Sequence, residues 1–196
     1  MDKENELPKR KPTRLKDFDY STPGAYFVTI CTRDRKHIFS EIVIPNAATT
    51  EVTNSAVGEG LAPPEYGVKL KPCGEVVQEQ LRSLETRFSS VTIEDYIIMP
   101  DHIHAILFLH EHAGGASPSP TLDGVLCAFK SLTSRICKQR YGIEKIFQRS
   151  SAEHIIRDRE DYETRRKYIY ENPMRWYYKY LNAEEQRLGI KQNDKL

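Results

Sequence analysis

Two histidines stand one residue apart, at positions 102 and 104, at the start of an apolar run that favours a β-strand. Residues i and i+2 of a strand project from the same face, so His102 and His104 should lie side by side. Two imidazoles on one rigid face form half of a metal site. The pattern is short and common, however, and taken alone it favours ordinary surface or hydrogen-bonded histidines.

A tyrosine and an amide, Tyr168 and Asn172, stand four residues apart in a segment with a helical pattern. They share a helix face and could both reach a site lined by the two histidines. A neighbouring stripe with a seven-residue period should face the core: Tyr162, Ile169 and Trp176. The alternative is a boundary tyrosine with its hydroxyl in water and an asparagine that ends the helix.

The sequence pattern also predicts the elements that position these residues. Strands are expected over residues 26–32, 39–44, 68–70, 91–99 and 102–109, and residues 153–157 are strand-like. Helices are expected over 72–88 and 121–140, and from 158 to about 172, where Pro173 should interrupt or redirect the chain before one or two further turns within 174–181. Pro100 and Asp101 should form a hairpin turn beside the histidines. The order predicts an α+β fold, a ferredoxin-like antiparallel sheet with helices on one face.

A chain of 196 residues fits one domain, which we place at residues 20–182. Residues 1–19 are charged and should form a flexible arm, residues 41–67 an acidic insertion, and residues 183–196 a polar tail. The four cysteines show no metal-binding or disulfide spacing, and no apolar run is long enough to cross a bilayer. We therefore expect a cytoplasmic protein without a membrane partner.

Charge is distributed unevenly although the formal net charge is only +1. Residues 121–149 are rich in cations, of which Lys130, Arg135, Lys138 and Arg149 are our candidates for contacting nucleic-acid phosphates. A solvated helix face is the commoner fate of such a run.

Taken together, these motifs resemble a known family. They occur in its order: Tyr26-Phe27-Val28-Thr29, Met99-Pro100-Asp101-His102-Ile103-His104, Phe129-Lys130-Ser131, Phe147-Gln148-Arg149, His154-Ile155-Ile156-Arg157 and Tyr168-Ile169-Tyr170-Glu171-Asn172-Pro173. The resemblance is to the IS200-like single-tyrosine transposases of the HUH (His-hydrophobic-His) nuclease superfamily, and most of all to the REP-associated tyrosine transposases. It spans residues 26–176, interrupted by the insertion.

The resemblance implies an HUH nuclease fold with a C-terminal catalytic helix, and it assigns roles to particular residues. Tyr168 would be the nucleophile that forms a 5′-phosphotyrosine, and His102, His104 and Asn172 would hold Mg²⁺ or Mn²⁺. The substrate would be single-stranded or hairpin DNA, cut and rejoined during transposition by a nucleoid-associated monomer or homodimer. A phenol is mostly protonated at neutral pH and needs activation near the metal.

The sequence departs from the family pattern at two positions. Phe147 stands where a tryptophan is common, and Asn172 stands where insertion-sequence members often carry a longer glutamine. The main alternative is a domesticated protein that binds DNA hairpins without cutting them. A HIT-type nucleotide hydrolase would need a third histidine where Ile106 stands, and replication initiators and relaxases usually carry further domains.

Overall fold

The computed structural model describes residues 19–43, 66–111 and 120–188. Its centre is an antiparallel sheet with the strand order β4-β5-β1-β6. The strands are β1 (Gly24–Cys31), β4 (Val91–Ile98), β5 (His102–Leu109) and β6 (Ala152–Ile156). This is the strand order of a ferredoxin-like split βαβ domain. The α+β fold class predicted from the sequence is confirmed.

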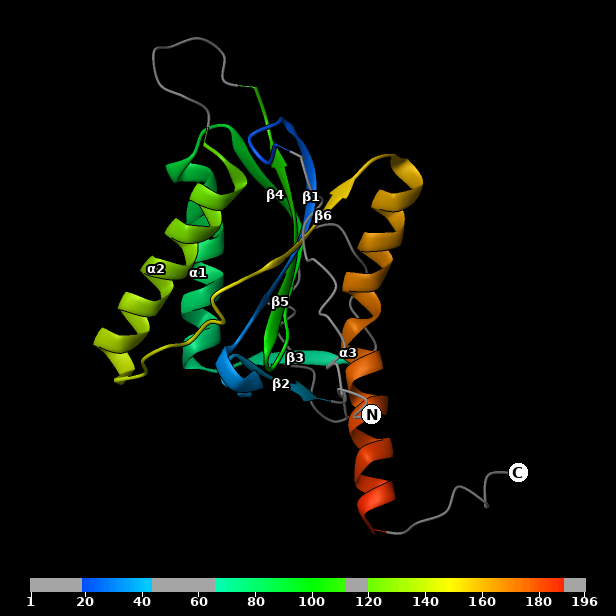
Figure 1. Ribbon diagram of the computed structural model, residues 1–196. Helices are drawn as coiled ribbons and strands as arrows, with labels where there is room; N and C mark the ends of the chain where they lie inside the picture. Colours follow the sequence, from blue (N-terminus) through cyan, green and yellow to red (C-terminus); the bar gives the residue numbers. More distant parts are fainter. Residues whose placement is uncertain (1–18, 44–65, 112–119, 189–196) are drawn as a thin grey trace, which may run out of the picture.

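Three helices cover the two faces of this sheet (Figure 1). Helices α1 (Pro72–Arg87) and α2 (Leu122–Tyr141) pack together on one face, and the long helix α3 (Arg159–Leu188) lies on the other. A small second sheet pairs β2 (Ser40–Val43) with β3 (Gly67–Leu70). Among the described residues, no helix combines the length and the apolar character that a membrane span needs.

The alternation of side chains along the strands builds a separate apolar core on each face. Tyr26, Val28 and Ile30 of β1 belong to the cluster beneath α1 and α2. Phe27, between them, belongs to the cluster beneath α3, which also contains Ile169. Because both faces are covered, β5 at the centre of the sheet is buried along most of its length. It is therefore a rigid support for the two histidines at its start.

The predicted hairpin is confirmed: β4 pairs with β5, and the Met99 amide donates to the His102 carbonyl at 2.8 Å. The expected break at Pro173 is wrong, because α3 continues through it to Leu188 and into the segment expected as a tail. A proline inside a helix costs about 3 kcal/mol. Ile169 and Trp176 lie one turn before and one turn after Pro173. Both pack into the apolar cluster beneath α3, and this packing offsets the cost. The expectations for residues 1–18, 44–65 and 189–196 lie outside the described residues.

Candidate active site

The two histidines project from β5 toward α3 and stand next to each other. His102 lies opposite Cys31 and His104 lies opposite Thr29 in the pairing of β5 with β1. Their ring centroids are 4.6 Å apart, and only 8% of His102 and 4% of His104 is exposed. The strand therefore places the imidazoles side by side, as the His-x-His spacing predicted.

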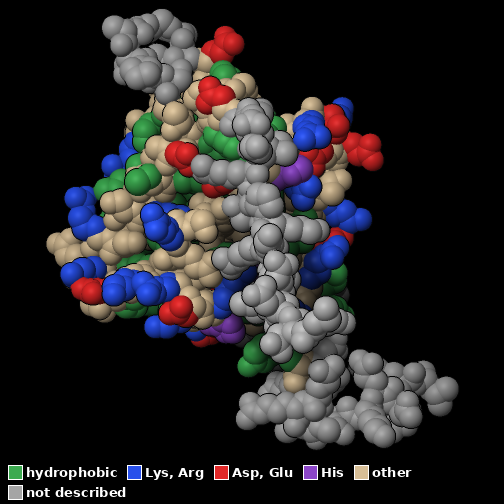
Figure 2. Space-filling model, viewed as in Figure 1, with side chains coloured by type: hydrophobic (Ala, Val, Ile, Leu, Met, Phe, Trp, Pro, Cys, Tyr) green, Lys and Arg blue, Asp and Glu red, His purple; other side chains and the backbone are tan. Residues whose placement is uncertain are grey.

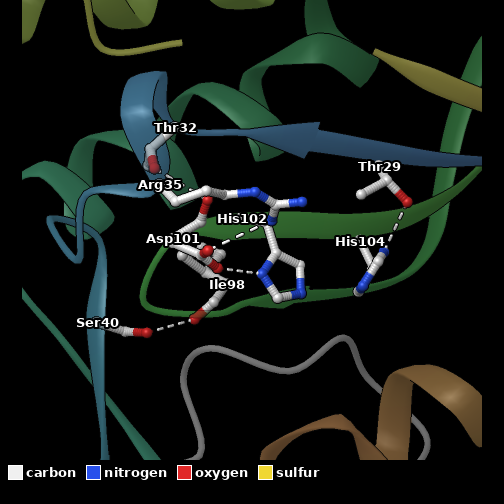
Figure 3. Close-up of polar contacts among 8 residues, drawn as sticks. All are labelled: Thr29, Thr32, Arg35, Ser40, Ile98, Asp101, His102 and His104. Atoms are coloured by element: carbon white, nitrogen blue, oxygen red, sulfur yellow. Dashed lines mark hydrogen bonds and ion pairs between the residues drawn. The ribbon is translucent and has the colours of Figure 1, made fainter. Parts of the chain in front are cut away.

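His102 is oriented by the residue before it. Its Nδ1 lies 2.5 Å from Asp101 Oδ1, while the guanidinium of Arg35 donates to Asp101 Oδ2 at 3.3 Å (Figure 3). Burial opposes the charge of Asp101, but the hydrogen bond and charge of His102, with Arg35, outweigh it and hold the pKa of this carboxyl below its usual value. An ionised Asp101 can only accept a hydrogen bond, so it favours the His102 tautomer in which Nδ1–H donates to the carboxylate and Nε2 carries the lone pair.

His104 carries an unpartnered nitrogen. Its Nδ1 lies 2.9 Å from Thr29 Oγ1, but its Nε2 is buried with no hydrogen-bond partner among the described residues (Figure 3). Burial, and after it the electrostatic influence of His102 and Arg35, lowers the pKa of His104 to about 3, so the His104 ring is neutral at neutral pH. A neutral imidazole is the form that binds metal ions, and a cation at Nε2 would remove the cost of an orphaned buried atom.

Asn172, the third ligand predicted from the sequence, lies on the helix that contacts this pair. It lies one turn of α3 after Tyr168, whose ring centroid is 5.1 Å from that of His104. It lies one turn before Trp176, whose ring centroid is 5.9 Å from that of His102. Only 6% of Asn172 is exposed. Within the described part of the chain no three His, Cys, Asp or Glu side chains gather as a metal site. Two imidazole nitrogens and an amide oxygen fit a divalent cation with open positions.

Tyr168 is the tyrosine of α3 whose ring reaches the histidines. Besides its contact with His104, its ring meets Phe27 edge-on at 6.0 Å, and the Arg175 guanidinium lies 5.9 Å from its centroid. Tyr168 is 37% exposed, so part of this residue is open to solvent. A partly exposed phenol beside an imidazole with an unpartnered nitrogen is a candidate for nucleophilic attack.

Tyr162, the nearest competitor on the N-terminal half of α3, is in a different environment. Its hydroxyl donates to Glu94 Oε1 at 3.3 Å, and its ring packs against Phe108. Burial, followed by the negative charges of Glu94 and Asp95, raises the pKa of Tyr162 to about 12. A phenol that resists ionisation and faces carboxylates is a poor nucleophile toward an anionic phosphate.

A buried ion pair fixes α3 on the sheet close to Tyr168. Arg166 donates through Nε to Asp95 of β4 at 2.8 Å, and Asp95 is only 1% exposed. Burial outweighs this pairing and raises the pKa of Asp95. The apolar side chain of Ile169, fully buried between α3 and the sheet, completes the attachment. These contacts hold the edge of the helix that carries Tyr168 and Asn172 over the histidines.

Comparison with known proteins supports the fold. No family model matches this chain. An uncharacterized protein of Haemophilus influenzae is 25% identical over 182 residues, which is 85% of this chain and 89% of that protein. A solved structure described as a REP-associated tyrosine transposase bound to a REP hairpin aligns with a TM-score of 0.50 and 17% identity, over 85% of this chain and 74% of that chain. A putative transposase of Deinococcus radiodurans R1 aligns with a TM-score of 0.42 and 15% identity, over 82% and 98% of the two chains. At 17% identity, the likeness to the first of these structures shows the fold alone.

The four cations predicted to contact DNA lie on the other side of the sheet, on or just after α2. Figure 2 shows Lys and Arg side chains on the α2 side of the molecule, and others on the α3 side. Lys130 is held by the carbonyls of Gln148 and Arg149 and by Ser151, and Lys138 pairs with Glu144 at 2.6 Å. The side chains of Arg135 and Arg149 are exposed.

A groove of about 760 Å³ runs between α2 and the segment that leads into β6. Lys130 and Arg149 line it together with several serines, and Asp123 and Glu153 also contribute. The structure thus separates this cationic surface from the histidines. The assignment of these cations to DNA stays a prediction.

Three residues beside the histidines were given no role at the site from the sequence, where Asp101 was expected only in the turn and Trp176 only on the core-facing stripe. Asp101 orients His102, Trp176 covers it, and Arg35 reaches Asp101 from a turn 66 positions away. The acidic residue directly before the first histidine could have indicated this role from the sequence, because metal-binding histidines commonly donate a hydrogen bond to a carboxylate. Contacts of Arg35 and Trp176 depend on how distant segments meet, and local sequence carries no sign of that.

Proposed function

We propose that this protein is a metal-dependent single-tyrosine endonuclease and strand transferase that acts on single-stranded or hairpin DNA. The observation that carries the proposal is the meeting of Tyr168 with His104: an accessible phenol ring lies 5.1 Å from an imidazole whose buried Nε2 has no partner among the described residues. The fold shared with a REP-associated tyrosine transposase supports the same conclusion.

The chemistry assigned to Tyr168 is an in-line displacement at phosphorus. A bond forms between the phenol oxygen and phosphorus, and the bond from phosphorus to the 3′-oxygen breaks. The phenol proton passes to solvent, and the departing 3′-oxygen takes up a proton. The products are a 5′-phosphotyrosine and a free 3′-hydroxyl. Because the phosphodiester is conserved as a tyrosine ester, a 3′-hydroxyl can reverse the step and rejoin strands without ATP.

The surrounding residues would prepare the site for this step. His102, His104 and Asn172 would hold a divalent cation, Mg²⁺ or Mn²⁺ by our proposal. When bound, that ion would supply a Lewis acid that polarises the scissile phosphate. Asp101 and Thr29 orient the two rings through Nδ1, so that each presents Nε2 to the same space. The ion pair between Arg166 and Asp95 keeps the phenol in place over the sheet.

The described residues of one chain supply all the groups proposed for this site. Within the described residues, α3 packs on the sheet of its own chain, and Tyr168, Asn172 and the two histidines come from one copy. We therefore propose that cleavage is carried out by each chain independently. A mixture of the Tyr168→Phe and His104→Ala variants, each inactive alone, should then stay inactive, whereas restored cleavage would mean that copies exchange α3.

The proposed activity is tested with a hairpin oligonucleotide carrying a single-stranded flank, incubated with Mg²⁺ and denatured before electrophoresis. A label at the 3′ end should migrate with the protein, and a label at the 5′ end should appear in a free fragment. Tyr168→Phe should form no adduct, while Tyr162→Phe, a matched loss of one hydroxyl on the same helix, should form it normally. If wild-type protein forms no adduct with hairpins or single strands, the proposal is wrong.

One observation favours a second function, that of a DNA-binding protein without cleavage. The groove beside α2, which Lys130 and Arg149 line, is separate from the histidines. DNA could therefore be bound there whether or not the histidine site is active. In that case the wild-type protein and the His104→Ala variant would bind hairpins equally well, and neither would form an adduct.

A further inference from the structure

A short charged turn beside the histidines has no role in the function proposed above. The 3-10 turn η1 (Arg33–Arg35) follows β1, and two consecutive residues in it, Asp34 and Arg35, have positive φ angles of 57° and 53°. Left-handed backbone is uncommon for residues other than glycine, and it persists only where the surrounding structure enforces it. Such positions concentrate at functional sites.

The turn is fastened to the hairpin that carries the histidines. The amide of Thr32 donates to the Asp101 carbonyl at 2.8 Å, and its hydroxyl donates to the same carbonyl at 3.0 Å. On the far side of the turn, the Phe39 amide donates to the Pro100 carbonyl at 3.1 Å. Both ends of the turn are therefore held by the two residues that directly precede His102, so the turn and the histidine pair form one rigid unit.

This attachment directs the Arg35 side chain to the site. Its guanidinium donates to Asp101 Oδ2, the oxygen that His102 leaves unused (Figure 3). In Figure 3 the Arg35 side chain extends alongside Asp101 toward His102. The side chain is 57% exposed, and Asp101 is the one hydrogen-bond partner of its guanidinium among the described residues. Most of its five N–H donors are therefore available to a ligand.

We propose that Arg35 is a phosphate-binding residue of this site, whose guanidinium donates to a non-bridging oxygen of the phosphodiester that Tyr168 attacks. The inference rests on the proposed function and names a further residue that contacts the substrate. The planar fork of a guanidinium matches phosphate geometry, and a fixed cation beside the reacting phosphate stabilises the charge that spreads over its oxygens. The enforced turn keeps that cation in place before the substrate arrives.

A purely structural role for Arg35 makes a different prediction. If the guanidinium only positions Asp101, its loss should disturb His102 and so weaken metal binding, with DNA affinity affected no more than by the loss of any exposed cation. If it binds phosphate, its loss should slow the reaction and weaken DNA binding while metal binding is retained. Trp176 provides a readout of the metal, because it is the single tryptophan of the chain and its ring lies 5.9 Å from that of His102.

The experiment compares Arg35→Gln, Arg35→Lys and the matched control Arg33→Gln, which removes a neighbouring exposed cation. Quenching of Trp176 fluorescence by Mn²⁺ gives metal affinity, and adduct formation at saturating oligonucleotide gives the rate. The same three substitutions are also made in the Tyr168→Phe variant, which should form no adduct. The affinity of these proteins for oligo-dT is measured over a range of salt concentrations, and the salt dependence gives the number of phosphate contacts.

Arg35→Gln should slow adduct formation by about 10²-fold, the typical cost of removing one donor to transition-state charge. It should also lower the slope of log affinity against log salt by about 0.7, one phosphate contact on a single strand. Mn²⁺ affinity should be unchanged, Arg35→Lys should recover part of the rate, and Arg33→Gln should resemble wild type. The proposal is overturned if Arg35→Gln matches Arg33→Gln in rate and slope, or if its only defect is in Mn²⁺ affinity. Should wild type form no adduct at all, the proposed function fails, and the salt slopes still decide the role of Arg35.

Discussion

The two faces of the sheet use polar residues in opposite ways. Beneath α3, the polar side chains around the proposed site are buried: His102, His104 and Asn172 are all less than a tenth exposed. Beside α2, cations are numerous and exposed, and several pair with acids or carbonyls, as Lys138 does with Glu144. Burying polar atoms on the α3 face costs free energy, whereas the charged groups beside α2 stay hydrated.

This difference separates chemistry from attachment. A buried nitrogen without a partner among the described residues, such as His104 Nε2, costs free energy unless a ligand satisfies it, which makes it a candidate contact for the proposed metal. Exposed cations are adjustable and are screened by salt, which suits them to a polymer of phosphates. Changes on the α3 face should therefore abolish the reaction, and changes on the α2 face should weaken binding by degrees.

The largest effect is expected from His104→Ala. This variant removes the nitrogen that faces the proposed metal, so both adduct formation and Mn²⁺ quenching of Trp176 should be lost. His110→Ala is the matched control, because that histidine is exposed just beyond the far end of β5 and contacts Thr92. Wild-type cleavage by His104→Ala would mean that the site is misassigned.

A smaller effect is expected from changing Asp101, which contacts the proposed ligand His102 and is not itself a proposed ligand. Asp101→Asn keeps an acceptor for His102 but removes its charge, and such changes behind a ligand typically reduce metal affinity by about 10–100-fold. Glu79→Gln, an exposed carboxylate on α1 that pairs with Arg140, should have no effect. Equal Mn²⁺ affinities for the two variants would contradict the orienting role of Asp101.

On the α2 face, the double variant Arg135→Gln/Arg149→Gln should weaken binding without changing the rate. Loss of two phosphate contacts should reduce the salt slope of single-strand binding by about 1.4. Adduct formation at saturating DNA should match that of wild type, because neither residue lies near Tyr168. An unaltered slope would show that this face does not meet DNA.

A further effect is expected on stability against pH in metal-free protein. His104 has its pKa lowered from 6.5 to about 3, so between these values the unfolded chain binds more protons at this residue than the folded chain. Its contribution to stability therefore rises with pH across that window and is fully present above 6.5. Urea denaturation at a series of pH values should show a flatter rise for His104→Gln than for wild type, and an identical rise would contradict the burial of a neutral His104.

Local periodicity was enough to predict the sheet, the hairpin and the shared face of Tyr168 and Asn172. Period-two alternation fixes which residues of β5 lie together, and helical spacing fixes which residues of α3 do. Local periodicity did not predict that α3 continues through Pro173. The packing that stabilises the helix there comes from residues on distant strands. Arg35 was missed for the same reason, since its position depends on hydrogen bonds between the turn and the hairpin.

The central claim is that Tyr168 is the nucleophile of the histidine site, and mapping the DNA adduct tests it most directly. Trypsin cleaves after Lys167 and Arg175, so Tyr168 and Tyr170 share one peptide and Tyr162 lies in another. Fragment-ion mass spectrometry of the digested adduct should place the nucleotide on Tyr168, and the signal should vanish in Tyr168→Phe. A nucleotide on Tyr170 or Tyr162, or an adduct that survives in Tyr168→Phe, would contradict the claim.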